Sequence, residues 1–384
     1  MIKTIITFLF YVILLFNNNL VANEIEKKLK VGLLAPFSGE YKNLGESLLL
    51  STQLALDEIN NKNIVIIPRD SGSNDNERLN IAIKEIISSG AKIIIGPVNS
   101  AFFDELKKYN DTIFISLSNK DPRILSNVIN IGISLESQLK AIEQLLIKEK
   151  KRKTIILYPK NKYEKFIDKK IKLLKLKNYK IFKYSSDPRI LTGEIEKLTN
   201  YNQRKKNLET RKNILEKRND DASEKELKIL EKFYTLGSLD FDSVIVIDFG
   251  NSLKSVLSSL VYTDIDDKAV LVTTVNQWFD ESIFRENSVN NLYFPSVDIK
   301  KFKKYNKKFF ETFGIKPNEI TILAYDALGL IYYIWDKNKG IETINDFFIK
   351  EKIKGKIGTF TFRDKKVFQQ LNIYKTENNK FKEY

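Results

Sequence analysis

The stretch Lys30-Val31-Gly32-Leu33-Leu34-Ala35-Pro36 decides the predicted fold of this chain. From Val31 onward it is apolar on consecutive positions, and it breaks into the turn residues Phe37-Ser38-Gly39-Glu40 before a helical apolar pattern occupies residues 45–60. A strand without polar alternation is expected where helices cover both faces of a parallel sheet. The stretch therefore predicts a β-strand that leads through a short loop into an α-helix.

Runs of the same kind recur through the chain, and segments with helical periodicity separate most of them. The strand-like runs are 30–36, 64–70, 92–98, 112–117, 128–133, 153–159, 179–184, 242–248, 269–274 and 292–296. Strands that alternate with helices predict an α/β fold with parallel sheets. With 384 residues, the chain exceeds the roughly 250–300 residues at which a single hydrophobic core stops growing, so we expect two α/β lobes.

Small polar residues follow several of these runs, at the point where each strand ends. Phe37 and Ser38 follow the first run, Ser100 lies just after the third, and Leu117-Ser118-Asn119 follows the fourth. Ligands of open parallel sheets bind outside the carboxyl ends of the strands, so these residues are candidate ligand contacts. The same residue types are common in turns that bind nothing, and the sequence leaves both interpretations open.

A change of pattern divides the predicted lobes. The helical pattern 139–148 opens a second βα series, and residues 301–313 and 320–335 are two successive helices without a strand between them. Residues 356–374 alternate as a terminal β-hairpin with its turn at 363–366. We therefore predict lobe 1 over 29–137 plus 300–355, and lobe 2 over 138–299 plus 356–384.

The charged segment 200–235 does not fit this alternation. Its apolar residues form a narrow stripe, and residues 219–224 divide it into two predicted helices, the second capped by Asp221 or Ser223. We predict a helical hairpin inserted into lobe 2. Such a projection buries little core, so it is either solvated surface decoration or a docking element for a partner.

The chain contains neither cysteine nor histidine. This composition excludes thiol nucleophiles, disulfides and histidine proton relays, and it removes the usual zinc ligands. The sequence also lacks a Gly-x-Ser-x-Gly elbow and a phosphate-binding loop. We therefore predict that the protein is not an enzyme and has no catalytic residue, no metal site and no cofactor.

The net charge of +15 comes from 64 lysines and arginines against 49 aspartates and glutamates, and the lysines are spread over most predicted helices. A nucleic-acid interface would concentrate its basic residues and interleave them with aromatic residues, and the sequence shows neither pattern. Nucleic acid is therefore not an expected partner, and a preference for anionic surfaces is favoured instead.

The N-terminal segment 1–22 is typical of a secretory signal peptide. Lys3 precedes an apolar stretch over 5–16, which is shorter than the roughly 20 apolar residues that span a bilayer. We expect cleavage after Ala22 and a periplasmic mature protein, and because the chain has no cysteine we do not expect a lipoprotein. An uncleaved membrane anchor is the alternative that the sequence leaves open.

The order and spacing of several motifs resemble the type 1 periplasmic binding proteins, specifically the leucine/isoleucine/valine-binding family. The motifs are 31–39, Gly45 at the start of the first helix, 55–60 at its end, 95–100, 115–119 and 323–328. The resemblance covers about residues 30–376. It implies two Rossmann-like lobes, joined by crossing segments, that close on a ligand by a hinge motion.

Within that family the chain is similar to the penicillin-binding-protein activators of Gram-negative bacteria. The similarity rests on 68–72, 241–244, 262–266, 273–278 and the charged hairpin. Activators of this class are often lipoproteins, whereas this sequence has no cysteine.

The resemblance also assigns ligand contacts by position. It implies that Ser100, Leu117, Ser118 and Asn119 contact the α-carboxylate and α-ammonium groups of a ligand. It places an aromatic lid at Tyr163.

Two aromatic residues, Phe249 and Trp278, follow later strands of the same lobe. Amino-acid receptors of the family place an acidic residue near the position of Asn276, and Asp248 is the nearest substitute here, with a helix cap as its alternative role. Tyr325 and Asp326 are further candidates, with helix packing or a hinge hydrogen bond as the alternative.

Two functions follow from the resemblance. The first is a solute receptor that closes on a small polar, carboxylate-bearing ligand such as an amino acid and delivers it to the membrane permease of an ABC-type transporter. The alternative is a regulator of cell-wall synthesis that uses the same fold to contact a peptidoglycan synthase.

Overall fold

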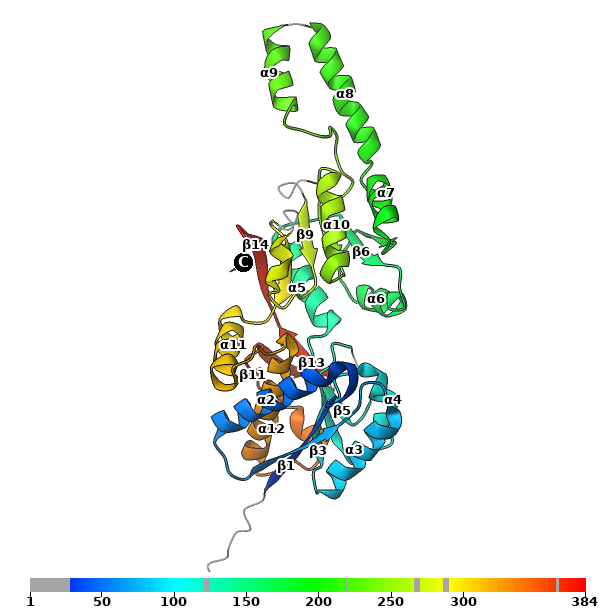
Figure 1. Ribbon diagram of the computed structural model, residues 1–384. Helices are drawn as coiled ribbons and strands as arrows, with labels where there is room; N and C mark the ends of the chain where they lie inside the picture. The colour runs from blue at the N-terminus through cyan, green and yellow to red at the C-terminus, as the bar shows by residue number, and fades with distance from the viewer. Residues whose placement is uncertain (1–27, 121–124, 219, 266–269, 286–289, 364–365) are drawn as a thin grey trace, which may run out of the picture.

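The computed structural model describes residues 28–120, 125–218, 220–265, 270–285, 290–363 and 366–384. The chain forms two α/β lobes stacked end to end, with a junction of strands and a long helix between them (Figure 1). The predicted signal peptide, 1–22, lies outside the described residues. Within them, no helix combines the length and the apolar character that crossing a membrane requires.

Lobe 1 contains a sheet in which every described pair of neighbouring strands is parallel, in the order β2-β1-β3-β4-β5. The strands are β1 (Leu29–Ala35), β2 (Ile64–Asp70), β3 (Ile93–Ile95), β4 (Ile113–Ser116) and β5 (Val128–Asn130). One face is covered by α2 (Lys42–Ile59) and α12 (Ile322–Asn338), and the other by α3 (Asn76–Ser88) and α4 (Phe103–Leu106). The short helices η2 (Gly39–Tyr41), η3 (Ser100–Phe102), η6 (Glu319–Thr321) and η7 (Ile344–Phe347) complete the lobe.

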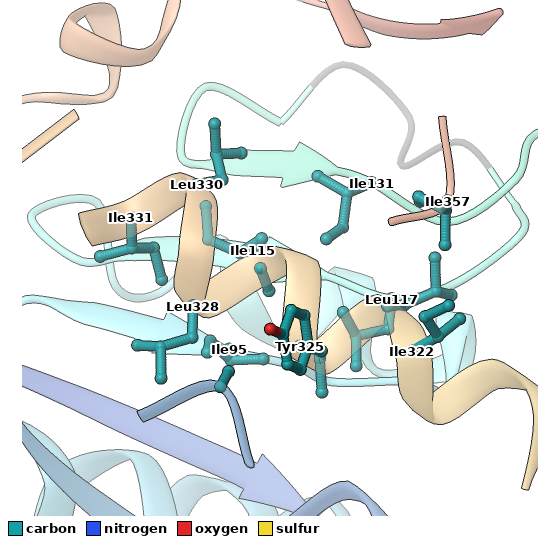
Figure 2. Packing of buried hydrophobic residues seen from close by; sticks show 14 of the residues in the cluster. Ile95, Ile115, Leu117, Ile131, Ile322, Tyr325, Leu328, Leu330, Ile331 and Ile357 are labelled. Atoms are coloured by element: carbon teal, nitrogen blue, oxygen red, sulfur yellow. The ribbon is translucent and has the colours of Figure 1, made fainter. Parts of the chain in front are cut away.

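Apolar side chains from the strands interlock with those of α12. Ile95 of β3 and Ile115 of β4 pack in one buried cluster with Leu328 of the helix (Figure 2). Successive residues of β1 explain why its sequence shows no polar alternation, because Leu33 belongs to this core and Leu34 to the core on the opposite face of the sheet.

Gly45 allows α2 to begin close to the end of β1. A Cβ atom at this position would lie 2.1 Å from the carbonyl oxygen of Pro36, so any side chain would push the helix away from the strand. The glycine thus keeps the loop between β1 and α2 tight at the carboxyl end of the sheet.

Lobe 2 contains a second sheet, in the described order β15-β14-β10-β9-β8-β6-β7. Its strands are β6 (Thr154–Pro159), β7 (Tyr179–Tyr184), β8 (Ser243–Val246), β9 (Leu271–Thr274), β10 (Tyr293–Ser296), β14 (Asn372–Glu377) and β15 (Lys380–Glu383). Helices α7 (Pro188–Leu198) and α10 (Gly250–Tyr262) cover one face, α5 (Leu135–Lys148) and α6 (Glu164–Ile171) cover the other, and η4 (Glu281–Arg285) follows β9. Of the segment 356–384, predicted to lie in lobe 2, β14 and β15 join this sheet through antiparallel pairs.

A small antiparallel sheet and α11 (Ile299–Phe313) form the junction between the lobes. The sheet contains β11 (Ile353–Lys354), β12 (Thr359–Arg363) and β13 (Lys366–Gln370). The pairing of β12 with β13 confirms a β-hairpin over 359–370, whereas residues 372–374, predicted in the same hairpin, belong to β14, and residues 364–365 of the predicted turn lie outside the described residues. Phe279, Phe294 and Tyr374 belong to the same buried cluster as α12, so the core of lobe 1 continues through the junction into lobe 2.

Helices α8 (Tyr201–Arg218) and α9 (Asp221–Leu230) form the predicted hairpin, which projects from lobe 2 on the side away from lobe 1 (Figure 1). Leu208, Leu215 and Leu230 pack between the two helices. At the base, the buried guanidinium of Arg204 donates hydrogen bonds to the Thr263 carbonyl at 3.1 Å and to Thr235 Oγ1 at 2.6 Å. The hairpin is therefore fastened to the end of α10.

The cap of α9 is Asp220, one residue before the predicted Asp221. Its side chain accepts a hydrogen bond from the Ser223 amide at 2.8 Å. Asp220 has the extended backbone of an N-cap residue, with φ −115° and ψ 159°, whereas Asp221 and Ser223 already lie inside the helix.

Candidate functional site

Loops that follow β1, β2 and β3 enclose a cavity of about 190 Å³ at the carboxyl end of the lobe 1 sheet. Its walls include Tyr41, Ser73, Asn74, Asn99 and Phe102. All the residues that line it are uncharged. The cavity is smaller than the roughly 300–1,000 Å³ of typical ligand sites, so a bound ligand would also need contacts from outside this pocket.

The Asp70 carboxylate organises the loops around this pocket. It accepts hydrogen bonds from the amides of Phe37 and Gly72, both at 2.9 Å, and pairs with Arg78 at 3.0 Å. Partial burial alone would raise the pKa of Asp70, but hydrogen bonds from Ser38 and from the two amides lower it below its ordinary value. Asp70 is therefore ionised, and its hydrogen bonds hold the loop after β1 against the loop after β2.

Asn99 joins the loops after β2 and β3. Its Nδ2 donates to Asn74 Oδ1 at 3.1 Å, and its Oδ1 accepts from the Ala101 amide at 2.9 Å. The predicted contact Ser100 is the next residue and begins η3. Ser73, Asn74 and Asn99 were not among the predicted contacts, although their positions just after strand ends were the available signal, and Tyr41 lies further from its strand, in η2.

The loop after β4 holds the other predicted contacts of lobe 1. Leu117 is 3% exposed and packs in the lobe 1 core, so only its backbone is placed for contact with a ligand (Figure 2). Ser118 is buried, and its Oγ accepts a hydrogen bond from the Lys120 amide at 3.1 Å. Asn119 is exposed. Ser118 thus shapes the turn that carries Asn119 and Lys120.

Lys120 and Tyr163 connect the two lobes. The Lys120 Nζ lies 4.2 Å from the centroid of the Tyr163 ring, and Lys162 Nζ lies 5.3 Å from the same centroid. Partial burial alone would raise the pKa of the Tyr163 hydroxyl, but the two lysine charges lower it below its ordinary value. Because Tyr163 follows β6 and remains 39% exposed, the carboxyl ends of strands from both sheets meet here with an accessible aromatic ring.

The remaining lobe 2 candidates have mixed surroundings. Asp248 accepts hydrogen bonds from the Phe249 amide at 2.8 Å and from the hydroxyls of Tyr184 and Ser252, so it stabilises the start of α10. Burial, followed by the Asp248 charge, raises the pKa of Tyr184. Phe249 is 54% exposed, and Trp278 packs with its ring centroid 6.2 Å from that of Phe302 in the junction.

Tyr325 and Asp326 lie on α12, away from the pocket at the strand ends. The buried Asp326 carboxylate accepts hydrogen bonds from the amides of Lys356 and Ile357, both at 2.8 Å. These bonds tie α12 to the turn between β11 and β12. Tyr325 lines a separate groove together with Asp326.

Comparison with known proteins agrees with this architecture. Residues 28–172 match the model of a family described as periplasmic binding protein. Across almost the whole chain, the structure superposes on solved structures that include substrate-binding proteins of branched-chain amino acid transporters. The chain has the type 1 periplasmic binding protein fold. The predicted resemblance and fold class are therefore confirmed, whereas no curated protein matches the sequence.

Three solved structures show the range of proteins that share this binding-protein fold. The C-domain of LpoA from Haemophilus influenzae, a regulator of PBP1A, is 13% identical with a TM-score of 0.63, over 92% of this chain and 99% of that one. The substrate-binding protein LivJ from Streptococcus pneumoniae, solved with isoleucine, is 18% identical with a TM-score of 0.58, and the match covers 93% of this chain and 98% of LivJ. A putative branched-chain amino acid ABC transporter protein from Rhodospirillum rubrum is 11% identical with a TM-score of 0.71, and the match covers 93% of this chain and 100% of that one.

Proposed function

We propose that this protein is a non-catalytic extracytoplasmic binding protein that closes on a small polar, carboxylate-bearing ligand, such as an amino acid, for ABC-type uptake. The contact between Lys120 and Tyr163 carries the proposal, because it brings a cation and an aromatic ring together between the lobes. The loop after β4 is also joined to the loop after β3, since Ser116 Oγ donates to the Pro97 carbonyl at 3.1 Å. The cation thus belongs to the same set of loops as the neutral pocket.

The charges in this region suit a carboxylate better than an ammonium group. Lys120 and Lys162 both approach the Tyr163 ring. The carboxylates of Asp70, at the end of β2, and of Asp248, just after β8, are instead engaged by donors of the protein itself. A ligand carboxylate placed between the lobes would gain a charge-assisted hydrogen bond from Lys120 and would leave no acidic side chain in the pocket unpaired.

A thermal screen with matched ligands tests this function. Amino acids, short peptides and cell-wall fragments would each be compared with the corresponding carboxamide at millimolar concentration. A carboxylate that binds only the folded protein raises the melting temperature, because a hundredfold excess over the dissociation constant stabilises the fold by about 2.7 kcal/mol. We expect at least one carboxylate to shift the transition while its amide does not. A screen in which no compound acts, or in which amides act equally, contradicts the proposal.

The hairpin favours a second candidate function, a regulator that contacts a peptidoglycan synthase. Its helices project from lobe 2 and are fastened at the base by Arg204 (Figure 1). Its outer surface carries exposed Ile214, Ile229 and Phe233. A fixed projection with exposed apolar residues is suited to docking on another protein.

A shortened hairpin tests the second function. Replacing residues 206–234 by a short Gly-Ser linker retains Arg204 and Thr235, and the amide of Leu236 already donates to the Arg204 carbonyl at 3.0 Å, so the linker has little distance to span. The shortened protein should melt like the intact one, because surface loops change the fold mainly through closure entropy. Under the regulator function it should no longer retain a peptidoglycan synthase from an envelope extract. Equal recovery by both forms contradicts that function.

A further inference from the structure

A second hollow lies where lobe 1 meets the junction, between α2, α11, α12 and the turn from β11 to β12, with a volume of about 800 Å³. It is separate from the pocket at the strand ends. Leu44, near the start of α2, lines that pocket, whereas Glu58, near the end of α2, lines this groove. At 1.5 Å per residue, the two positions are about 20 Å apart along the helix.

Five lysines line the groove. Lys301, Lys304 and Lys308 of α11 have the spacing i, i+3 and i+7, which places them on one stripe of the helix. Lys354 and Lys356 belong to β11 and the turn that follows it. The lysine stripe of α11 therefore lines the same groove as two lysines from a segment that is distant in sequence.

Glu58 shows how this groove recognises a carboxylate. Its two carboxylate oxygens accept hydrogen bonds from Lys308 Nζ at 2.9 Å and Lys356 Nζ at 3.1 Å. Partial burial alone would raise the pKa of Glu58, but hydrogen bonds from Tyr325, Lys308 and Lys356 lower it to about 2. The groove therefore already contains a built carboxylate contact, occupied by a side chain of the protein itself.

The positive charge of the groove exceeds what its own acids neutralise. Lys304 and Lys354 are exposed, and neither forms an ion pair with any acidic residue in the described part of the chain. Asp326, the other acidic residue of the lining, is buried and bonded to backbone amides. The ammonium groups of Lys304 and Lys354 are thus available to an acidic ligand. They line the same groove as Lys308 and Lys356, which already bind the Glu58 carboxylate.

We propose that this groove binds an acidic peptide segment of a partner protein. Lys301 and Lys308 are seven residues apart on α11, so about 10 Å of helix separates them. An extended peptide spans this distance in about three residues, so acidic side chains along one strand can reach successive lysines, which a single compact anion cannot. The tyrosines of the lining, Tyr305, Tyr332 and Tyr333, supply surface for the apolar parts of such a segment.

Fluorescence anisotropy with fluorescein-labelled hexaglutamate and the full chain tests the groove. The variant Lys304→Ala/Lys354→Ala removes two groove lysines that make no internal ion pair. Its matched control is Lys303→Ala/Lys352→Ala, which removes two exposed lysines of the same segments outside the groove lining and changes the net charge equally. We expect about a tenfold loss of affinity in the groove variant and less than about a twofold change in the control.

A third variant should strengthen binding to the same groove instead of weakening it. Glu58→Gln removes the internal carboxylate that occupies Lys308 and Lys356, so hexaglutamate should bind at least about threefold more tightly. Unchanged or weaker binding by Glu58→Gln, or equal losses in the two lysine variants, contradicts the proposal. Competition by inorganic phosphate or tricarballylate at the same concentration as unlabelled hexaglutamate also overturns it, because the occupant would then be a small anion.

Discussion

Lys120 lies over the face of Tyr163, with 4.2 Å between Nζ and the ring centroid, and this pair joins loops from the two different sheets. A cation over an aromatic face contributes about 0.5–1 kcal/mol at an exposed site. Micromolar binding of a ligand supplies about 8 kcal/mol, so a ligand between the lobes can readily rearrange this contact. The pair is therefore suited to a site that opens and closes.

Substitutions at Tyr163 should separate the role of its ring from that of its hydroxyl. Tyr163→Phe keeps the aromatic face for Lys120, so we expect its free energy of unfolding to stay within a few tenths of a kcal/mol of the original value. Tyr163→Ala removes the face and should cost about 1 kcal/mol. Urea unfolding of the ligand-free variants measures both. Equal losses in the two variants would assign the contact to the hydroxyl.

Closure of the lobes can be measured with two introduced cysteines. The chain contains no cysteine, so Glu77→Cys in α3 and Lys165→Cys in α6 would be the only sites for spin labels. Both positions are exposed, near the starts of helices that follow the carboxyl ends of β2 and β6. We expect the ligand with the largest thermal shift to shorten the mean distance between the labels by more than about 2 Å. An unchanged distance distribution would show that binding does not move the lobes.

Two arginines of α8 should differ strongly in their contribution to stability. Arg204 is buried at the base of the hairpin and donates to Thr235, whereas the half-exposed Arg211 pairs with Glu226 at 2.7 Å. Arg204→Met should lower the free energy of unfolding by about 2–4 kcal/mol, because buried acceptors lose their donor. Arg211→Met should cost less than about 1 kcal/mol. Chemical denaturation of both variants checks the difference, and similar costs would mean that the base is not a buried anchor.

Asp326 should give the protein a characteristic pH dependence. Burial raises its pKa from 3.8 to about 6, against the opposing hydrogen bonds from the Ile357 and Lys356 amides and the charges of Lys356 and Lys301. Between these values the folded state holds a proton that the unfolded state has released. The protonated Asp326 side chain therefore contributes its full stabilisation, about 3 kcal/mol of the free energy of unfolding, below about pH 4. This contribution is lost as the pH rises through about 6.

Asp326→Asn cannot ionise, so it should remove this slope. The measurement is urea unfolding of both proteins from about pH 4 to about pH 7, and the test is the difference between their slopes. Equal slopes would show that Asp326 is ionised in the folded protein over the whole range.

The fold was predictable because its pattern is local. The apolar run in β1, the turn after it and the helical period of α2 all lie within about thirty residues, and buried strands need no distant information. The positions of Ser100 and Ser118 at strand ends followed from the same pattern. The cap of α9 was misplaced by one residue because Asp220 and Asp221 are equally good cap types, and only the backbone angles distinguish them.

Much of the candidate site was not predictable because it depends on contacts between distant segments. Nothing in the sequence around Lys120 distinguishes it from the many other lysines of the chain, and only the fold brings it over the ring of Tyr163. The basic groove joins α11 to the turn after β11, about fifty residues further along the chain, so the spacing of Lys301, Lys304 and Lys308 alone gave no signal.

Calorimetric titration of the strongest carboxylate ligand into Lys120→Gln tests the central claim, that the ligand lies between the lobes. Lys92→Gln is the matched control, because Lys92 is exposed on the same lobe just before β3, at the amino end of the parallel strands, whereas Lys120 follows the carboxyl end of β4. Loss of a charge-assisted contact should weaken binding by Lys120→Gln about tenfold or more, while Lys92→Gln should bind like the unaltered protein. Unchanged affinity in Lys120→Gln would contradict this position, because the ligand would then bind away from the interlobe site.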